Sequence, residues 1–206
     1  EEEFLERATK IIDLFQQHFF DETTGTLAEF FASDWTQLTD AKSQLVEPGH
    51  HYEWCWLLLR FDRLKPTEGL RQTALKLFTH ARAFGHQPGG AALDFMNRDG
   101  SQPDAGISAK PLDRARCWPQ TEALQATCEL EKTGVASASD FKKEMLDILF
   151  GQYLLSDWNA MTLAGDGAKA GGWVDVLDKD GKPVAPYMPS STIYHILSAI
   201  KVLNGH

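Results

Sequence analysis

The chain has 206 residues, of which 43% are hydrophobic, and it carries a formal net charge of −9. That length favours one domain that can bury a sizeable core. An acidic chain is a poor match for nucleic acid or an anionic membrane surface, and no apolar run approaches the roughly 20 residues that a bilayer-spanning helix needs. We therefore predict neither a nucleic-acid partner nor a membrane partner.

The three cysteines, Cys55, Cys117 and Cys128, form no CxxC pair and stand in apolar or helical contexts. This pattern is typical of reduced core thiols and favours a cytoplasmic location. No signal peptide is visible. The first residue is Glu rather than Met, which is what a fragment or a trimmed product would show.

Six helices are predicted from apolar residues that recur at helical spacing. The first, third and fifth are amphipathic, whereas the second, fourth and sixth are apolar on nearly every side and should therefore be buried. A proline at its start, Pro66, is expected to open the third helix. In chain order the expected helices span about 2–19, 48–64, 66–82, 118–132, 137–155 and 190–203.

Short strands are predicted between the helices. The sequence TLAEFF follows a turn at Asp21–Gly25, and LDFMN precedes a turn at Arg98–Gly100. Residues 156–189 form a long insertion, and its segment 171–184 alternates around Asp180-Gly181, which predicts a β-hairpin.

The order of the connections predicts the architecture. Links that lead into a buried helix are long, roughly 28 to 35 residues, and links that leave one are only a few residues, which implies antiparallel neighbours. All three buried helices should then begin at the same end of a repeated αα-hairpin. We predict an all-α fold, an α/α toroid of the (α/α)6-barrel type. Since such a barrel needs twelve helices, the single domain 1–206 should be half of one.

Polar and aromatic residues gather at the start of each buried helix, where the long loops would surround them. The second helix opens with His50, His51 and Glu53, and the last opens with Tyr194 and His195. The start of the fourth helix carries Arg114, Arg116, Trp118, Gln120 and Glu122. These residues should converge on one small-molecule site.

Histidine is the side chain best suited to proton transfer near neutral pH, so His50 and His195 are the candidate acid and base. His50 is favoured over His51 because it shares a helix face with Glu53, three residues on. A metal site from His50, His51 and Glu53 is an alternative. We expect no metal, because adjacent histidines point to different helix faces and HHxE is not the zinc pattern HExxH.

Three motifs together resemble one known family. PGHHYEWCWLL at Pro48–Leu58, WPQTE at Trp118–Glu122 and the pair Tyr194-His195 are similar to motifs in the C-terminal half of the N-acylglucosamine 2-epimerase family. The resemblance covers essentially the whole chain. It implies an (α/α)6 barrel about twice this length and an activity on sugars, as 2-epimerase or mannose-type aldose–ketose isomerase, with no cofactor.

The resemblance also implies roles for residues. His50 and His195 would be the acid and base at carbon 2 of a ring-opened, mannose-type or N-acylglucosamine-type aldose, with Glu53 positioning His50 or a sugar hydroxyl. Sugar contacts are expected from Trp118, Gln120, Glu122, Arg114, Arg116 and Trp54.

Two alternatives stay open. A glycoside hydrolase on the same barrel would use two facing carboxylates, such as Glu53 with Glu122 or Asp175. The other is a catalytically incomplete half-barrel that only binds sugar, since an isolated fragment could be inactive. We also expect a homodimer, or another association through the open barrel edge, because inner helices exposed there would leave a large apolar patch.

Overall fold

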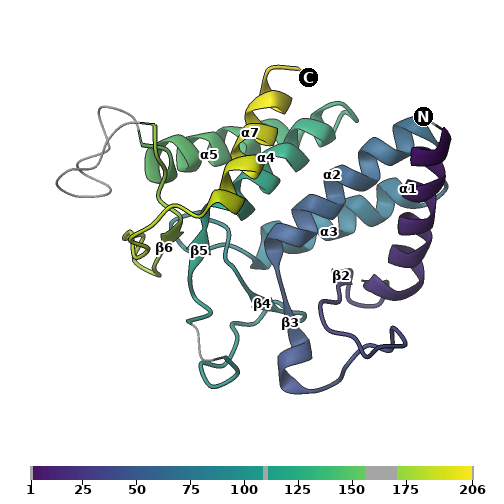
Figure 1. Ribbon diagram of the computed structural model, residues 1–206, viewed down its shortest axis with the longest axis horizontal. Coiled ribbons are helices and arrows are strands. Elements are labelled where there is room, and N and C mark those ends of the chain that lie inside the picture. The colour runs from purple at the N-terminus through teal and green to yellow at the C-terminus, as the bar shows by residue number, and fades with distance from the viewer. Residues whose placement is uncertain (1, 109–110, 156–170, 206) are drawn as a thin grey trace.

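A computed structural model describes residues 2–108, 111–155 and 171–205 (Figure 1). Within these ranges the chain forms six α-helices and three small sheets, so the all-α prediction is confirmed. The first and fifth helices each continue into a π-helical turn, Phe15–Phe19 and Leu149–Tyr153, and a 3-10 helix spans Ala41–Gln44. The helices are α1 (Glu2–Leu14), α2 (Pro48–Leu64), α3 (Leu70–Phe84), α4 (Cys117–Glu131), α5 (Ser137–Ile148) and α7 (Ser190–Leu203).

Helix α4 is the centre of the molecule. Every residue from Cys117 to Leu130 is buried, because α2 and α7 flank this helix and α5 packs on its outer side. Helix α3 covers α2 in the same way. The predicted alternation of inner and outer helices is confirmed for these elements, which give the fold of an α/α barrel.

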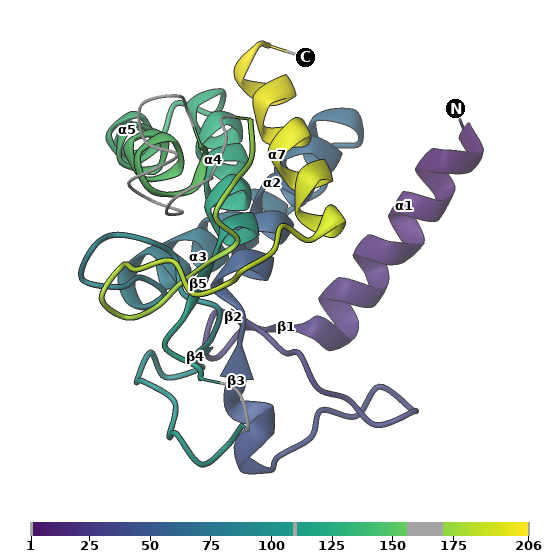
Figure 2. The same ribbon diagram turned by 60° about the vertical axis from the view of Figure 1, so that its left-hand side comes forward.

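Two helices form the edges of the assembly. Figure 2 shows α1 standing apart from the other helices, and Ile12 is its one buried residue. Helix α7 was predicted to be buried, but Ile193, Tyr194 and Leu197 are 44–59% exposed. No described helix covers this side of α7, so the prediction is wrong for this face of the helix.

The third helix begins later than predicted. Pro66 lies before it, and α3 starts at Leu70 after Gly69, whose φ of +85° is a left-handed conformation that interrupts the helix. The side chain of Asp62 holds the connection by accepting a hydrogen bond from the Thr67 N–H at 2.9 Å.

The strands are short and pair antiparallel across the loops. Strand β1 (Phe20–Asp21) pairs with β2 (Thr26–Leu27), β3 (Leu45–Val46) with β4 (Met96–Asn97), and β5 (Ala115–Arg116) with β6 (Val176–Leu177). The strands expected in TLAEFF and LDFMN are confirmed over two residues each. The predicted hairpin turns at Asp178–Lys182, with an antiparallel bridge between Leu177 and Pro183, and its strand β6 also pairs with β5. The other part of that insertion, 156–170, lies outside the described residues.

These pairings bring the entrances of the inner helices together. Strand β3 leads directly into α2, and its partner β4 lies in the loop that leads to α4. Strand β5 leads directly into α4, and its partner β6 lies in the loop that leads to α7. Figure 1 shows the strands and long loops at one end of the helices, as the connection lengths predicted.

The three cysteines are buried free thiols. Among the described helices, none combines the length and the apolar character needed to cross a membrane.

Candidate active site

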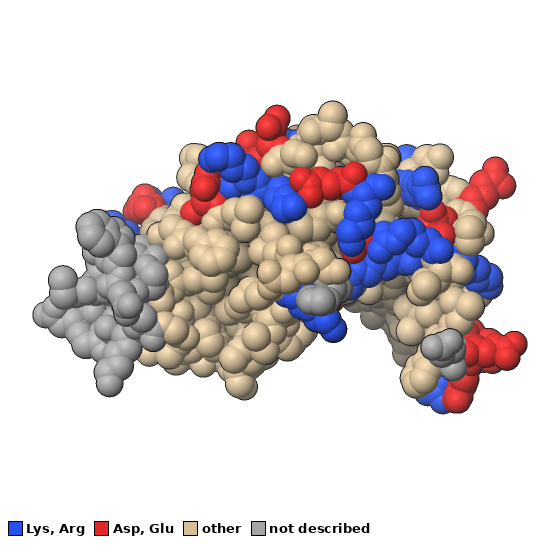
Figure 3. All heavy atoms as spheres, turned by 90° about the horizontal axis from the view of Figure 1, so that it is seen from above, with Lys and Arg blue, Asp and Glu red and all other residues tan. Residues whose placement is uncertain are grey.

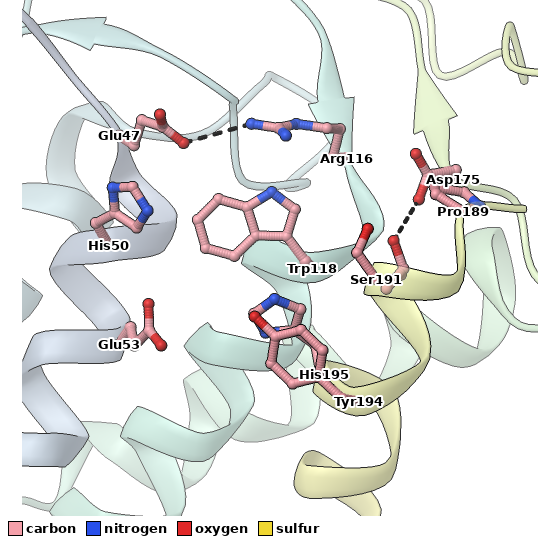
Figure 4. Close-up of a pocket in the computed structure, with 11 residues that line it drawn as sticks. Glu47, His50, Glu53, Arg116, Trp118, Asp175, Pro189, Ser191, Tyr194 and His195 are labelled. Carbon is pink, nitrogen blue, oxygen red and sulfur yellow. Dashed lines mark hydrogen bonds and ion pairs between the residues drawn. The ribbon is translucent and has the colours of Figure 1, made fainter.

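The entrances of α2, α4 and α7 surround a pocket of about 350 Å³. Figure 4 shows side chains from all three helices around this pocket, together with side chains from the segments that precede them, and His50 and His195 are among them. Histidines 145 positions apart in the sequence thus reach one site, because their helices begin at the same end. The other lining residues are Glu47, Glu53, Arg116, Trp118, Asp175, Pro189, Ser191, Thr192 and Tyr194.

His50 is held by Glu29, which lies in the loop after β2. The Nδ1 atom of His50 donates to both carboxylate oxygens of Glu29, at 3.0 and 3.1 Å. Glu29 also accepts the backbone N–H of Glu47 at 3.2 Å, so its carboxylate sits at the positive end of α2. Burial by itself would lower the pKa of His50, but the hydrogen bond and charge of Glu29, with the charges of Glu47 and Glu53, raise it to about 9. His50 is therefore a cation at neutral pH.

His195 is held by Glu122, on α4. Its Nδ1 donates to Glu122 Oε1 at 2.7 Å. The same carboxylate accepts the indole N–H of Trp56 at 2.6 Å and the amide of Gln125 at 3.2 Å. Glu122 is only 1% exposed, so the imidazole is tied to a rigid, buried acceptor. Among the described residues, no hydrogen-bond partner contacts the other ring nitrogen, Nε2.

Trp118 forms the floor between the two histidines. Its ring centroid lies 5.2 Å from that of His50 and 5.4 Å from that of His195. The ring packs directly on Gly49, where a Cβ atom would lie 2.4 Å from Trp118 Cη2. The glycine of the PGH sequence therefore makes room for the indole.

Carboxylates dominate the rest of the pocket. Burial and the nearby charge of Glu122 raise the pKa of Glu53, although the histidines oppose this. The guanidinium of Arg116 is paired with Asp94 at 2.9 Å and with Glu47 at 3.4 Å. Asp175 accepts the hydroxyl of Thr192 at 2.8 Å. Arg116 is the one Lys or Arg among the described lining residues, and its charge is already compensated.

Several residues predicted to contact sugar lie elsewhere. Gln120 is fully buried. Its amide oxygen accepts the Ala92 N–H at 2.7 Å, and its amide nitrogen donates to the Ala92 carbonyl at 2.8 Å. Gln120 therefore ties a loop to α4 instead of facing the pocket. Glu122 lies behind His195. Arg114 is not in the lining, and Trp54 packs on Phe15 with ring centroids 4.3 Å apart beside a neighbouring pocket.

His51 lies in the core, which is consistent with the choice of His50 over His51 as the candidate acid or base. Its Nδ1 donates to the Glu47 carbonyl at 2.9 Å and its Nε2 accepts the Leu27 N–H at 3.2 Å. Burial lowers its pKa to about 4, so it is neutral. The metal alternative made of His50, His51 and Glu53 is therefore not assembled.

Another group has the spacing of metal ligands. One ligand atom each from Glu29, Glu47 and His50 lie within 4.8 Å of one another. All three are already engaged, however: Glu29 with His50, and Glu47 with Arg116. The arrangement is that of an ion-pair network, which a metal ion would have to break.

Two carboxylates beside His50 were not identified from the sequence. Glu29 stands 21 positions before His50 in a segment with no motif, and Glu47 precedes the proline of α2. Glu47 directly precedes the PGH sequence, and this position could have marked it as a site residue. Glu29 carried none, because its contact depends on the path of the loop after β2.

The sequence matches the model of the N-acylglucosamine 2-epimerase (GlcNAc 2-epimerase) family over residues 1–199. The chain belongs to this family. A mannose-6-phosphate isomerase from Rhizobium meliloti (strain 1021) is 31% identical over 211 residues, which cover 94% of this chain and 46% of that protein. The chain thus spans about half the length of this relative.

Solved structures share the fold. A cellobiose 2-epimerase from Bacillus thermoamylovorans B4167 superposes with a TM-score of 0.71 at 18% identity, over 98% of this chain and 48% of that one. A sugar epimerase from a ruminal bacterium gives 0.71 at 15% identity, over 100% and 49%. A D-mannose isomerase gives 0.63 at 16% identity, over 95% and 64%. In the two epimerase structures the match covers about half of the solved chain.

Proposed function

We propose that this chain carries the histidine pair of a sugar isomerase or epimerase that moves a proton at carbon 2 of a ring-opened, uncharged aldose. The observation that supports this most is the pair of His50 and His195 around one pocket, each with Nδ1 bound to its own carboxylate. Membership of the family supports the same class of reaction.

In the proposed reaction His195 removes the proton from carbon 2. The electron pair of that C–H bond forms the C1–C2 double bond, while the carbonyl oxygen takes a proton from the cationic His50. The product is an enediol. Return of a proton to carbon 1, with loss of the hydroxyl proton on O2, gives a ketose. Return of a proton to the opposite face of carbon 2, with loss of the hydroxyl proton on O1, gives the epimer. Glu53 would position a sugar hydroxyl, and Trp118 would pack against the sugar carbons.

The charge of the pocket favours a neutral sugar. Three carboxylates, Glu47, Glu53 and Asp175, face a single arginine that is already paired twice. A phosphate group would meet repulsion there and find no free cation among the described lining residues. We therefore expect a higher kcat/KM for mannose-type aldoses than for their 6-phosphates, although a relative is named for mannose 6-phosphate.

The hydrolase alternative has weaker support. A glycoside hydrolase needs two carboxyl groups free to act on the substrate. Both oxygens of Glu122 already accept hydrogen bonds, from His195 and Trp56. Glu53 and Asp175 remain as a pair, but that reaction would leave the two oriented histidines without a role.

Proton exchange at carbon 2 tests the proposal. The full-length protein is incubated with unphosphorylated aldoses in heavy water, and loss of the C2 proton signal is followed by NMR. We expect exchange by the wild type and a loss of roughly 10²-fold or more in His195→Ala, with His18→Ala, which changes a histidine outside the pocket, as matched control. Absence of exchange with every aldose tried would refute the proposal.

Association through the open edge is also proposed. Phe4 and Ile11 on α1, and Leu197 on α7, are 54–74% exposed, which leaves apolar surface on both edge helices. Seen from above, a broad area without charged side chains lies beside a band of Lys, Arg, Asp and Glu (Figure 3). Sedimentation of this chain should show a dimer or larger species, and a stable monomer would contradict the idea. The cytoplasmic location stays a prediction.

A further inference from the structure

Polar contacts continue from the pocket along the inner helices toward their other ends. On α2, Trp56 and Arg60 are four residues apart and share one face of the helix. On α4, Glu122 and Glu129 are seven residues apart, about two turns along one face. The indole N–H of Trp56 donates to Glu122 Oε2 at 2.6 Å. Arg60 Nε donates to Glu129 Oε1 at 2.9 Å, so α2 and α4 are joined by one polar contact behind His195 and by another further along.

Glu129 fixes the far contact. It is only 1% exposed, and its carboxylate accepts hydrogen bonds from Arg60, from Arg63 and, at 3.1 Å, from Lys132. Burial by itself would raise the pKa of Glu129, but the hydrogen bonds from these three cations lower it. The carboxylate is therefore ionised at neutral pH and holds the guanidinium of Arg60 in one place.

Arg60 is held directly over the indole of Trp56. Its Cζ atom lies 4.4 Å from the ring centroid, which is the geometry of a cation–π contact. The cation draws electron density from the ring, and in a buried network such polarisation strengthens the next hydrogen bond. The Trp56 N–H is therefore a strong donor, in agreement with the short 2.6 Å bond that it makes to the carboxylate of Glu122.

Trp56 determines which way the Glu122 carboxylate faces. Glu122 Oε2 accepts the indole N–H, and Glu122 Oε1 accepts Nδ1 of His195 at 2.7 Å. The amide of Gln125 lies 3.2 Å from both oxygens, so it favours neither orientation. Because the two oxygens of a carboxylate are rigidly joined, the donor on one oxygen fixes the direction in which the other meets the imidazole. Neither Trp56 nor Arg60 is among the described residues that line the pocket, so any effect on His195 passes through Glu122.

We propose that Trp56 and Arg60 are positioning residues for the imidazole of His195. Arg60 holds the indole, and the indole holds one oxygen of Glu122. The other oxygen of Glu122 then keeps His195 in the tautomer that carries its proton on Nδ1. The positioning role rests on the proposed function and deepens it, because it states how the base of that reaction is oriented. Its most distant member, Arg60, lies about 10 Å beyond Glu53 along the axis of α2.

The orientation of His195 can be measured without a substrate. In full-length protein with isotope-labelled histidine, NMR spectra recorded over a range of pH show which ring nitrogen of His195 carries the proton. We expect the Nδ1–H tautomer in the wild type, a smaller share of it in Trp56→Phe, which keeps a ring but lacks the N–H, and an intermediate share in Arg60→Met. Arg63→Met is the matched control, because both arginines bind Glu129 but, among the described residues, Arg60 is the cation over the indole. A His195 tautomer that is the same in every variant would overturn the proposal.

Kinetics of C2 exchange give the second readout. Trp56→Phe should lower kcat about tenfold and Arg60→Met about threefold, with KM within about twofold of the wild type, because the lining of the pocket is unchanged. Arg63→Met should keep the wild-type kcat, although its loss of Tm should match that of Arg60→Met, since each variant removes one cation from Glu129. Equal losses of kcat in the two arginine variants, or a wild-type kcat in Trp56→Phe, would contradict the positioning role. If the wild type exchanges no aldose, the proposed function fails, whereas the tautomer of His195 still decides the role of Trp56 and Arg60.

Discussion

Replacing Glu29 by Gln should lower the pKa of His50 and move the pH range of the proposed activity. The variant keeps the size of the side chain and removes the charge that holds the imidazolium. Wild-type His50 has a pKa of about 9 against a usual 6.5, whereas burial acts in the opposite direction. Without the carboxylate of Glu29, the pKa of His50 should fall toward its usual 6.5, because burial opposes the remaining charges of Glu47 and Glu53.

The size of the effect on activity follows from the protonated fraction of His50. At pH 8 a group with a pKa of about 9 is about 90% protonated, and one with a pKa of 6.5 is about 3% protonated. If cationic His50 is the acid, kcat/KM at pH 8 should fall roughly 30-fold, with a much smaller loss near pH 6.

The assay is NMR titration of the His50 imidazole in wild type and Glu29→Gln, with a pH profile of kcat/KM alongside. Glu22→Gln, which changes an exposed glutamate far from the pocket, is the matched control. A His50 pKa that stays near 9 in Glu29→Gln would refute the role given to Glu29.

The same ion pair makes stability depend on pH. Because the folded pKa of His50 is raised, its contribution is fully present below pH 6.5 and is lost as pH rises through about 9. The shift corresponds to about 3 kcal/mol at about 1.4 kcal/mol per unit, but 36% of the His50 side chain is exposed, and solvent screening reduces this to about 1–2 kcal/mol. Urea unfolding at pH 6 and pH 9 should show this loss in wild type and a smaller one in Glu29→Gln.

Two other variants address positioning. Glu122→Gln should reduce kcat roughly 10²-fold with little change in KM, because the variant lacks the charged acceptor that fixes the ring of His195. An unchanged kcat would exclude this role for Glu122. Gly49→Ala should lower kcat/KM, because its new Cβ would collide with Trp118, while Gly89→Ala, which meets open space, serves as control. Retained kcat/KM in a folded Gly49→Ala protein would show that the position of the indole does not matter.

Local sequence patterns predicted the helices well, because the spacing of apolar residues indicates both where a helix forms and which face it buries. Pro48 at the first turn and an apolar run after it placed α2 from Pro48 to Leu64, as observed. The prediction was weaker at α3, where Gly69 rather than Pro66 decides the start. It was wrong for the outward side of α7, because apolar periodicity does not state whether a neighbour is present.

For the site residues as well, the sequence predicted what depends on a helix position and missed what depends on a tertiary contact. Residues at a helix entrance, His50, Glu53, Trp118 and His195, line the pocket as their positions indicated. Gln120 stands in the same motif but faces the Ala92 backbone, because its place on α4 points it toward a loop whose path the motif does not encode.

The sequence by itself determined six helices, their inner and outer order and the common end at which the inner helices begin. These features depend on periodicity and on the length of connections, which are local properties of the chain. Only the tertiary structure decided which carboxylate serves which histidine, Glu29 for His50 and Glu122 for His195. Those pairs join residues 21 and 73 positions apart, and they form because strand pairing between loops and the packing of α7 on α4 bring the side chains within hydrogen-bonding distance.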